Sequence, residues 1–187
     1  MNKRRKIELQ IGGIVILAVA FSLALYFIGA ERIVEIIGVE NTYLVIFFIA
    51  LFGGMTSIGG VSYTGSIITF VAGGASPWII ALAAGLGTTL GDVTYYMVAR
   101  HGSKALGDGW LSTKVKKVSE WLKNRSAKMK FLVVYLYMGF TPFPNDPLTI
   151  TLGLSRVPKK IVIPALALGD TTFAFLLAYL GNWLPFV

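Results

Sequence analysis

The chain of 187 residues has no cysteine, one histidine and few charged residues. Without cysteine it forms no disulfide and offers no thiolate for catalysis or metal binding. The single histidine, His101, excludes a multi-histidine metal site. Charged residues make up 14% of the chain, whereas about a quarter of a soluble domain is charged. With 55% hydrophobic residues and a mean hydropathy of +0.71, the composition predicts an integral membrane protein.

Positive charge dominates the ionisable residues and falls in three clusters. The formal net charge is +8, and 16 of the 17 lysines and arginines lie at positions 3–6, 100–130 and 156–160. Basic clusters beside apolar spans mark the cytoplasmic face of a membrane protein and can hold anionic lipid headgroups. This pattern favours membrane lipids over nucleic acid as partners. It predicts a multi-pass protein of the cell membrane with its N-terminus in the cytoplasm.

The apolar segments differ in length, and this difference predicts the topology. Three of them, at 9–30, 77–99 and 161–184, are long enough to span a bilayer as helices. The segments 43–74 and 131–155 are too short to cross twice, because two spans and a turn need roughly 40 residues. We therefore expect each to enter halfway as a re-entrant hairpin, from opposite faces. The predicted fold is an all-α integral membrane protein with three full spans and two oppositely oriented hairpins.

Further features predict an internal repeat and two surface helices. The Gly-Asp pairs at 91–92 and 169–170 lie 78 residues apart, each in a span that follows a hairpin. Because the hairpins enter from opposite faces, the second unit is inverted, as in many secondary transporters. Amphipathic helices are expected on the outer surface at 31–40 and on the cytoplasmic surface at 112–130. We expect a single membrane domain over 1–187, with segments 1–40, 41–100, 101–130 and 131–187.

The second hairpin contains three prolines within six residues, Pro142, Pro144 and Pro147. They cannot all remain helical, since proline lacks an N–H group and clashes with the preceding turn. Non-helical backbone at membrane depth is tolerated only where protein covers it or water reaches it, and transporters bind substrates and ions at such breaks. These prolines, together with Gly59 and Gly60 in the first hairpin, are expected to shape the two hairpin turns.

Three of the nine acidic residues, Asp92, Asp146 and Asp170, fall at membrane depth. An ionisable residue in the centre of a membrane helix costs about 2.5–3.5 kcal/mol on insertion scales. The cost is lower if the acids cluster around a shared proton, cation or water-filled cavity. We therefore expect them to couple transport to H+ or Na+, with no other cofactor. Structural alternatives stay open, since Asp92 can pair with Tyr96 or Arg100, and Asp146 suits an ordinary turn.

A second set of polar residues is predicted to contact the headgroup of a substrate. Hydroxyls and freed backbone N–H groups near the hairpin tips can receive a polar headgroup, and Arg100 can hold it at the inner surface. The alternative is that the hydroxyls only satisfy the broken backbone. The predicted substrate-binding residues are Ser62, Tyr63, Thr64, Tyr96, Arg100, Thr141 and Asn145.

The segment 91–102 resembles the G-D-x-x-x-Y-x-x-G-R motif of the DedA family, also called the SNARE-associated or VTT-domain family, with Ala99 in place of the second glycine. The proline-bearing hairpin and the glycine-rich segment before Gly73 resemble the family's two re-entrant motifs. The resemblance implies a transporter that moves lipids across the bilayer, with polyprenyl-phosphate or phospholipid as cargo and proton or sodium coupling. It places Asp92 and Arg100 in the family's second motif.

The chain departs from the family pattern in both hairpins. Many members carry an acid in the first hairpin, where this chain has residues 62–64, and arginines in the second, where no lysine or arginine lies between Lys130 and Arg156. An acid-only core attracts cations and repels phosphate. A secondary transporter of a small polar solute or cation is therefore the alternative function, and a non-transporting membrane assembly protein is another. We do not expect an enzyme, because lipid-phosphate phosphatases commonly use histidines. Assembly into a homo-oligomer is compatible with the sequence.

Overall fold

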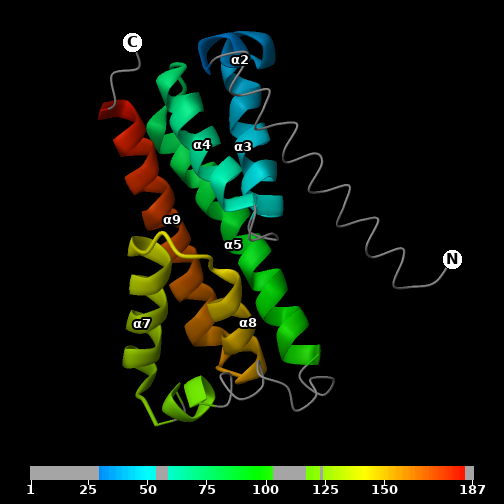
Figure 1. Ribbon diagram of the computed structural model, residues 1–187, viewed down its shortest axis with the longest axis vertical. Coiled ribbons are helices and arrows are strands. Elements are labelled where there is room, and N and C mark those ends of the chain that lie inside the picture. The colour runs from blue at the N-terminus through cyan, green and yellow to red at the C-terminus, as the bar shows by residue number, and fades with distance from the viewer. Residues whose placement is uncertain (1–29, 54–58, 103–116, 123, 184–187) are drawn as a thin grey trace, which may run out of the picture.

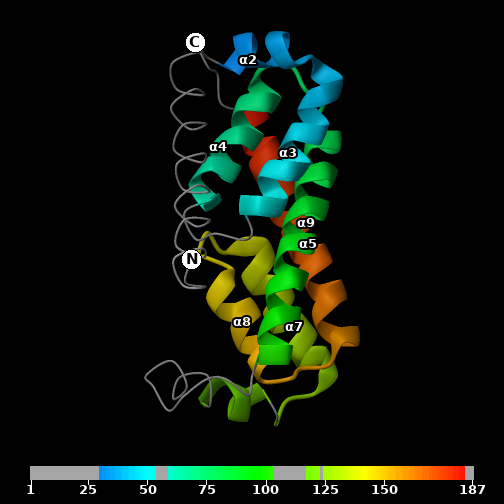
Figure 2. The same ribbon diagram turned by 90° about the vertical axis from the view of Figure 1, so that its right-hand side faces the viewer.

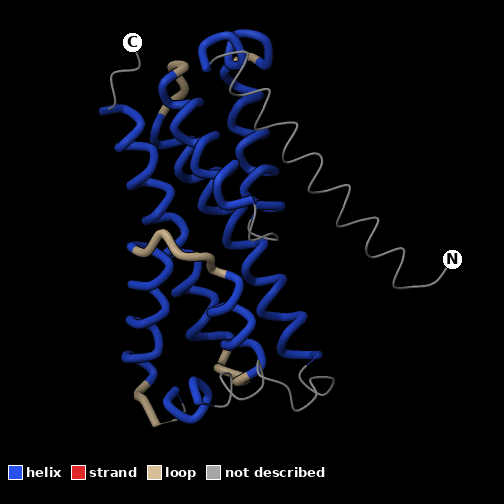
Figure 3. The backbone as a smooth tube through the Cα atoms, in the orientation of Figure 1, coloured by secondary structure: helices blue, strands red, loops and turns tan. Residues whose placement is uncertain are grey.

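The structure is a computed structural model that describes residues 30–53, 59–102, 117–122 and 124–183. Within these ranges the chain is mainly helical and has no strand (Figure 3), which confirms the predicted all-α class. The helices are α2 (Ala30–Ile37), α3 (Val39–Gly53), α4 (Gly59–Ala72), α5 (Pro77–Gly102), α7 (Ala127–Phe140), α8 (Asp146–Leu154) and α9 (Lys159–Trp183). The predicted span at 9–30 lies outside the described residues except for Ala30.

Helices α5 and α9 form the central pair and run the length of the bundle (Figure 1). They have 26 and 25 residues, which corresponds to about 39 and 37 Å of helix. A glycine allows their close approach, because a Cβ atom at Gly85 would lie 2.7 Å from Thr171 Cα. Among the described helices, only α9, over Lys159–Leu180, is both long and apolar enough to cross a membrane.

The shorter helices form two pairs at opposite ends of the central pair (Figures 1 and 2). Helices α3 and α4 lie at one end together with α2, and α7 and α8 lie at the other. Each pair reaches only to about the middle of the central helices, and the loop between α7 and α8 crosses the bundle at this level (Figure 3). Two short helix pairs therefore meet from opposite ends, as the hairpin prediction requires. Their depth in a bilayer stays a prediction.

Each short pair contacts both central helices in the same pattern, although α3 and α4 also pack on each other whereas α7 and α8 have little direct contact. Helix α3 packs against α5 and α7 against α9, whereas α4 contacts α9 and α8 contacts α5. Glycines lie at the tightest contacts. A Cβ atom at Gly87 of α5 would meet Phe47 O in α3, and one at Gly169 of α9 would lie 2.5 Å from Met138 Cβ in α7. The shared pattern supports the predicted internal repeat.

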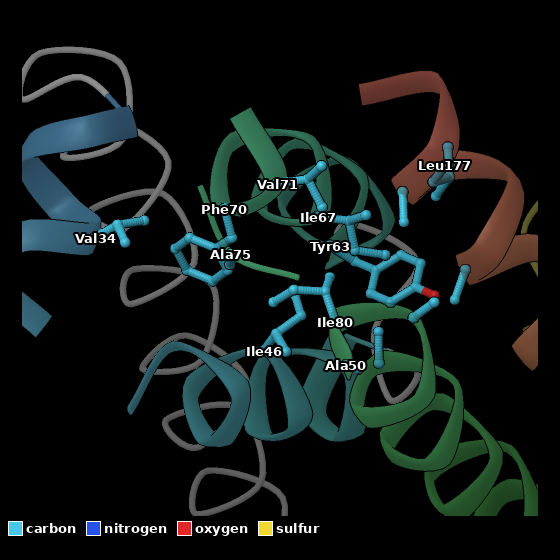
Figure 4. Close-up of a cluster of buried hydrophobic side chains, with 14 residues drawn as sticks. Val34, Ile46, Ala50, Tyr63, Ile67, Phe70, Val71, Ala75, Ile80 and Leu177 are labelled. Carbon is cyan, nitrogen blue, oxygen red and sulfur yellow. The ribbon is translucent and has the colours of Figure 1, made fainter. Parts of the chain in front are cut away.

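Buried apolar side chains form two clusters, one in each half of the bundle. The first joins α3, α4 and α5 through Ile46, Ile67, Phe70 and Ile80 (Figure 4). The second joins α5, α7, α8 and α9 and contains Tyr96, Val134, Met138, Leu152, Val162 and Leu166. The level at which the hairpins meet lies between these clusters, so polar groups there are enclosed by apolar packing on both sides.

Large apolar side chains also cover the outside of the bundle. On α5 they recur every four residues as Trp78, Leu82, Leu86 and Leu90, all exposed. Exposed residues of the same kind on α3, α7 and α9 are Leu44, Phe48, Phe52, Leu132, Leu136, Phe140, Leu168, Leu176 and Leu180. Soluble monomers rarely expose such an extended apolar surface. Lipid tails, which are as apolar as leucine, provide a suitable environment for it.

Two predicted helix boundaries are wrong. The outer helix expected at 31–40 ends at Ile37, because Gly38 adopts a φ of 81°, and α3 already begins at Val39. The cytoplasmic helix expected at 112–130 does not continue to its predicted end. Residues 117–122 are helical, residues 124–126 are not, and Ser126 starts α7 by accepting a hydrogen bond from Met129 N–H at 3.2 Å. Serine is a favoured N-cap, so the basic residues beyond it belong to α7.

Candidate functional site

Two buried carboxyl groups lie where α5 and α9 pack together. The side chains of Asp92 on α5 and Asp170 on α9 are 0% and 2% exposed. Thr89, one turn before Asp92 on α5, donates its hydroxyl to Asp170 Oδ2 at 3.0 Å. The two carboxyls therefore lie close enough for Asp170 to act electrostatically on Asp92. Buried charges require partners, so this pair is the strongest candidate for a functional centre.

The tip of the second hairpin reaches this centre through Asn145. The residue occupies the N-cap position of α8, yet its side chain does not cap the helix. Instead, Asn145 Nδ2 donates a long hydrogen bond of 3.4 Å to Asp92 Oδ2. Asp146 follows at the first position of α8, is only half-buried and also acts electrostatically on Asp92. Of the three predicted acids, Asp92 and Asp170 share the buried site and Asp146 lies at its edge.

The first hairpin contributes Tyr63 from the beginning of α4. This side chain is 6% exposed, and Figure 4 shows its ring extending from α4 toward α5 and α9. Its hydroxyl lies within electrostatic range of both Asp170 and Asp92. The structure thus places Tyr63 with the acid pair. Two other predicted residues belong to the same helix. Thr64 is half-buried in α4, and the structure describes Ser62 only as a residue of that helix.

The centre contains several buried oxygen atoms without hydrogen-bond partners. In the described part of the chain, four buried side-chain atoms lack a partner, and three of them are Asp92 Oδ1, Asp170 Oδ1 and the Tyr63 hydroxyl. An unsatisfied buried polar group costs about 1–3 kcal/mol. Such atoms in a native fold call for an explanation, such as an ion, a water or a proton that they bind.

Two predicted substrate-binding residues, Tyr96 and Arg100, hold the turn between α8 and α9, and their substrate-binding role stays a prediction. The Tyr96 hydroxyl donates to Val157 O at 2.6 Å, and Arg100 Nη1 donates to the same carbonyl and to the Tyr96 hydroxyl, both at 2.8 Å. The alternative in which Asp92 pairs with Tyr96 is wrong, because Tyr96 donates to Val157 and Asp92 accepts from Asn145. Sequence spacing could not reveal these contacts, which join segments 53 to 61 residues apart.

The helix break predicted at the prolines is present. Helix α7 ends at Phe140, and Thr141 closes it by donating its hydroxyl to Tyr137 O at 2.6 Å. Pro142 and Pro144 are exposed in the loop, where Tyr137 donates its hydroxyl to Pro144 O at 3.1 Å. Pro147 lies in the first turn of α8, a position that tolerates proline. Thr141 therefore acts as a helix cap in this structure.

The predicted turn residues of the first hairpin lie after the turn. Gly59 and Gly60 form the beginning of α4, and the connection to α3 falls at residues 54–58, outside the described residues.

Replacing Tyr96 tests whether it has a structural or a substrate-binding role. Tyr96→Phe removes the hydroxyl that joins Arg100 to Val157 O, and we expect a loss of about 1 kcal/mol of stability, measured as a lower Tm in detergent. Tyr95→Phe is the control for stability, because the half-buried Tyr95 hydroxyl makes no hydrogen bond to the described residues. It does not control for substrate binding, since that hydroxyl is within electrostatic range of Asp146 and Asp92. Weaker substrate binding by Tyr96→Phe at an unchanged Tm would show the predicted substrate-binding role and contradict the structural one.

The fold and the site together define a helical membrane protein with a polar centre between two opposed helix pairs. A family model for the VTT domain matches residues 63–183. The chain therefore belongs to the VTT-domain family, which is the DedA family, and the matched region includes Tyr63, Asp92, Asn145 and Asp170. No curated protein and no solved structure gave a significant match to the chain.

Proposed function

We propose that this protein transports lipids across the cell membrane as a flippase or scramblase, with polyprenyl-phosphate or phospholipid as cargo. The observation that carries the proposal is the meeting of two short helix pairs, from opposite ends, at the buried acid pair of α5 and α9. Broken helices that meet near the membrane midplane form the substrate and ion sites of many secondary transporters. Membership of the VTT-domain family supports a transporter-like role.

Helix length supports the proposed arrangement in the bilayer. Helices α3, α4 and α7 have 15, 14 and 14 residues, so each is about 21–23 Å long and too short for a hydrocarbon core of about 30 Å. In our proposal they enter as re-entrant hairpins from opposite faces, while 9–30 and α9 cross fully. Helix α5 also crosses fully in this arrangement, because its 26 residues are long enough, although it is less apolar than α9. Exposed Trp78 and Tyr179 contact each other edge to face at one end of the central pair, where an aromatic belt would lie.

The opposite end of the central pair is basic and supports its assignment to the cytoplasm. Lys128 in the first turn of α7 and Lys159 and Lys160 at the start of α9 are exposed there, together with Arg156. Basic residues concentrate on the cytoplasmic side and attract anionic headgroups. In our proposal this end collects the phosphate headgroup before it moves. Our proposal puts the N-terminus on the same side, with the predicted span at 9–30 crossing once before α2.

We propose that the acid pair couples lipid movement to H+ or Na+. Two carboxylates enclosed by apolar clusters repel each other, and a bound proton or cation removes this repulsion. Asn145 connects the Asp92 carboxyl to the tip of the second hairpin. Binding of a proton or cation at Asp92 would therefore alter the hydrogen bond that holds this loop. The chemistry is transport rather than catalysis.

Lipid movement by the purified protein in liposomes tests the proposal. A fluorescent phospholipid and a labelled polyprenyl phosphate are reconstituted with the protein, and their arrival in the outer leaflet is followed with and without imposed H+ or Na+ gradients. We expect protein-dependent movement of at least one of these lipids, with the double variant Asp92→Asn/Asp170→Asn as control. Wild-type protein that moves neither lipid under any gradient would refute the proposed function.

The composition of the centre favours one alternative, a secondary transporter of a small polar solute or cation. The residues that meet there are carboxyls, hydroxyls and an amide, and no lysine or arginine lies between Lys130 and Arg156. Under this alternative, ion gradients drive solute uptake, and Asp146→Asn at the edge of the site abolishes it. Gradient-driven solute uptake in the absence of lipid movement would establish the alternative.

A further inference from the structure

Three oxygen atoms without partners in the described residues come from three different helices at one place. They are Asp92 Oδ1 from α5, Asp170 Oδ1 from α9 and the Tyr63 hydroxyl from α4. All three side chains are at least nine-tenths buried. The Tyr63 ring extends toward α5 and α9 (Figure 4), and its hydroxyl is within electrostatic range of both acids. A buried hydroxyl without a hydrogen-bond partner near two carboxyl oxygens in the same state calls for an explanation, such as a ligand that all three oxygens bind.

The second oxygen of each carboxyl already has a protein donor. Thr89 donates to Asp170 Oδ2 at 3.0 Å, and Asn145 donates to Asp92 Oδ2 at 3.4 Å. The Thr88 hydroxyl lies near the Tyr63 hydroxyl and acts on it electrostatically. Because Thr88 donates its proton to Ala84 O at 3.0 Å, it offers no proton to the Tyr63 oxygen. Each carboxyl is therefore oriented by one hydrogen bond, and one oxygen of each remains available to a ligand.

We propose that Asp92 Oδ1, Asp170 Oδ1 and the Tyr63 hydroxyl bind one monovalent cation and that Na+ is the preferred ion. This inference deepens the coupling role in the proposed function and rests on it. Hard cations prefer oxygen ligands from carboxylates and neutral groups. Within the described residues, no group of three or more His, Cys, Asp or Glu side chains is placed to hold a metal ion. Two carboxylates and a phenol suit a single positive charge, which offsets their mutual repulsion.

The proposed site gives the cation a mechanical effect. Tyr63 is in the first turns of α4, close to the end of the first hairpin that faces the middle of the bundle. A cation bound to Tyr63, Asp92 and Asp170 would join this hairpin to both central helices. Binding therefore favours the conformation in which the first hairpin is closed on the centre, because only that conformation presents all three ligands.

Sodium binding to the full-length protein in detergent tests the site. Equilibrium dialysis with radioactive Na+ is expected to show saturable binding of one ion per chain. The Tm is expected to be higher in NaCl than in choline chloride at equal ionic strength. Tyr63→Phe is expected to weaken Na+ binding about tenfold. The same variant should keep or raise the Tm without Na+, because the lost hydroxyl has no partner to leave unsatisfied.

Tyr43→Phe is the matched control, because the Tyr43 hydroxyl accepts a hydrogen bond from Ser76 N–H at 3.1 Å away from the acids. It should lower the Tm and leave Na+ affinity unchanged. No Na+ binding by the wild type, or equal affinity in Tyr63→Phe and wild type, would overturn the inference. Lipid movement that persists without Na+ binding would refute the site but not the proposed function, whereas Na+ binding without lipid movement would refute the function alone.

Discussion

Gly153→Val is expected to destabilise the protein by about 3 kcal/mol, lowering its Tm in detergent by roughly 6–12 °C. Gly153 lies where α8 packs on α5, and even a single Cβ atom there would meet Tyr96 O and approach Ala99 Cβ to 2.8 Å and Arg100 N to 3.0 Å. These are backbone and Cβ atoms, which cannot rotate away. The bulkier side chain therefore forces α8 off α5, and with it Asn145 away from Asp92.

Gly65→Ala provides the matched control for this substitution. Gly65 is within α4, and a Cβ atom there would meet nothing within 4 Å. Alanine is favoured over glycine inside a helix by up to about 1 kcal/mol, so the control should be as stable as the wild type or slightly more stable. If Gly153→Val melted at the wild-type temperature, the close packing of α8 on α5 would be wrong.

Asp170→Asn and Asp92→Asn are each expected to reduce ion-driven lipid movement about tenfold or more. The amide has nearly the same shape and can still accept a hydrogen bond from Thr89 or Asn145, so the fold should be kept. It cannot carry a proton or a negative charge. Interactions with a charged group are worth about 1.5–3 kcal/mol, and each 1.4 kcal/mol corresponds to roughly a factor of ten. Rates in liposomes, normalised to the amount of folded protein, measure the effect.

Glu40→Gln removes the same charge from an exposed position at the beginning of α3 and serves as the control. It should move lipid at the wild-type rate. Wild-type, gradient-dependent rates in both Asp variants would show that the buried acids do not couple transport. Such tolerance is the result expected of a non-transporting assembly protein.

Features that depend on neighbouring residues could be predicted from the sequence. The break between α7 and α8 follows from three prolines, because proline removes an N–H and clashes with the preceding turn whatever surrounds it. The position of Asp92 and Asp170 within long helices follows from the lengths of the apolar segments. The two wrong helix boundaries are also local. Gly38 ends one helix, and Ser126 begins another, inside segments whose amphipathic pattern predicts one continuous helix.

The hydrogen-bond partners of individual site residues could not be predicted, because each partner lies far along the chain. Asn145, a predicted substrate-binding residue, donates to Asp92, which lies 53 residues away. Tyr96, also predicted to bind substrate, donates its hydroxyl to the backbone oxygen of Val157, which lies 61 residues away. Thr89 was not identified, although its bond to Asp170 helps to join the central helices. A threonine in an apolar helix gives no signal of its own until the facing helix is known.

The sequence alone determined that this is an all-α membrane protein with interrupted helices and acids inside its apolar segments, because hydropathy, helix length and proline chemistry act along the chain. Only the tertiary structure decided which groups surround those acids. The register with which α4, α8 and α9 pack on α5 depends on close contacts at Gly85, Gly153 and Gly169, and helix packing across the bundle brings Tyr63 and Asn145 to the same pair of carboxyls.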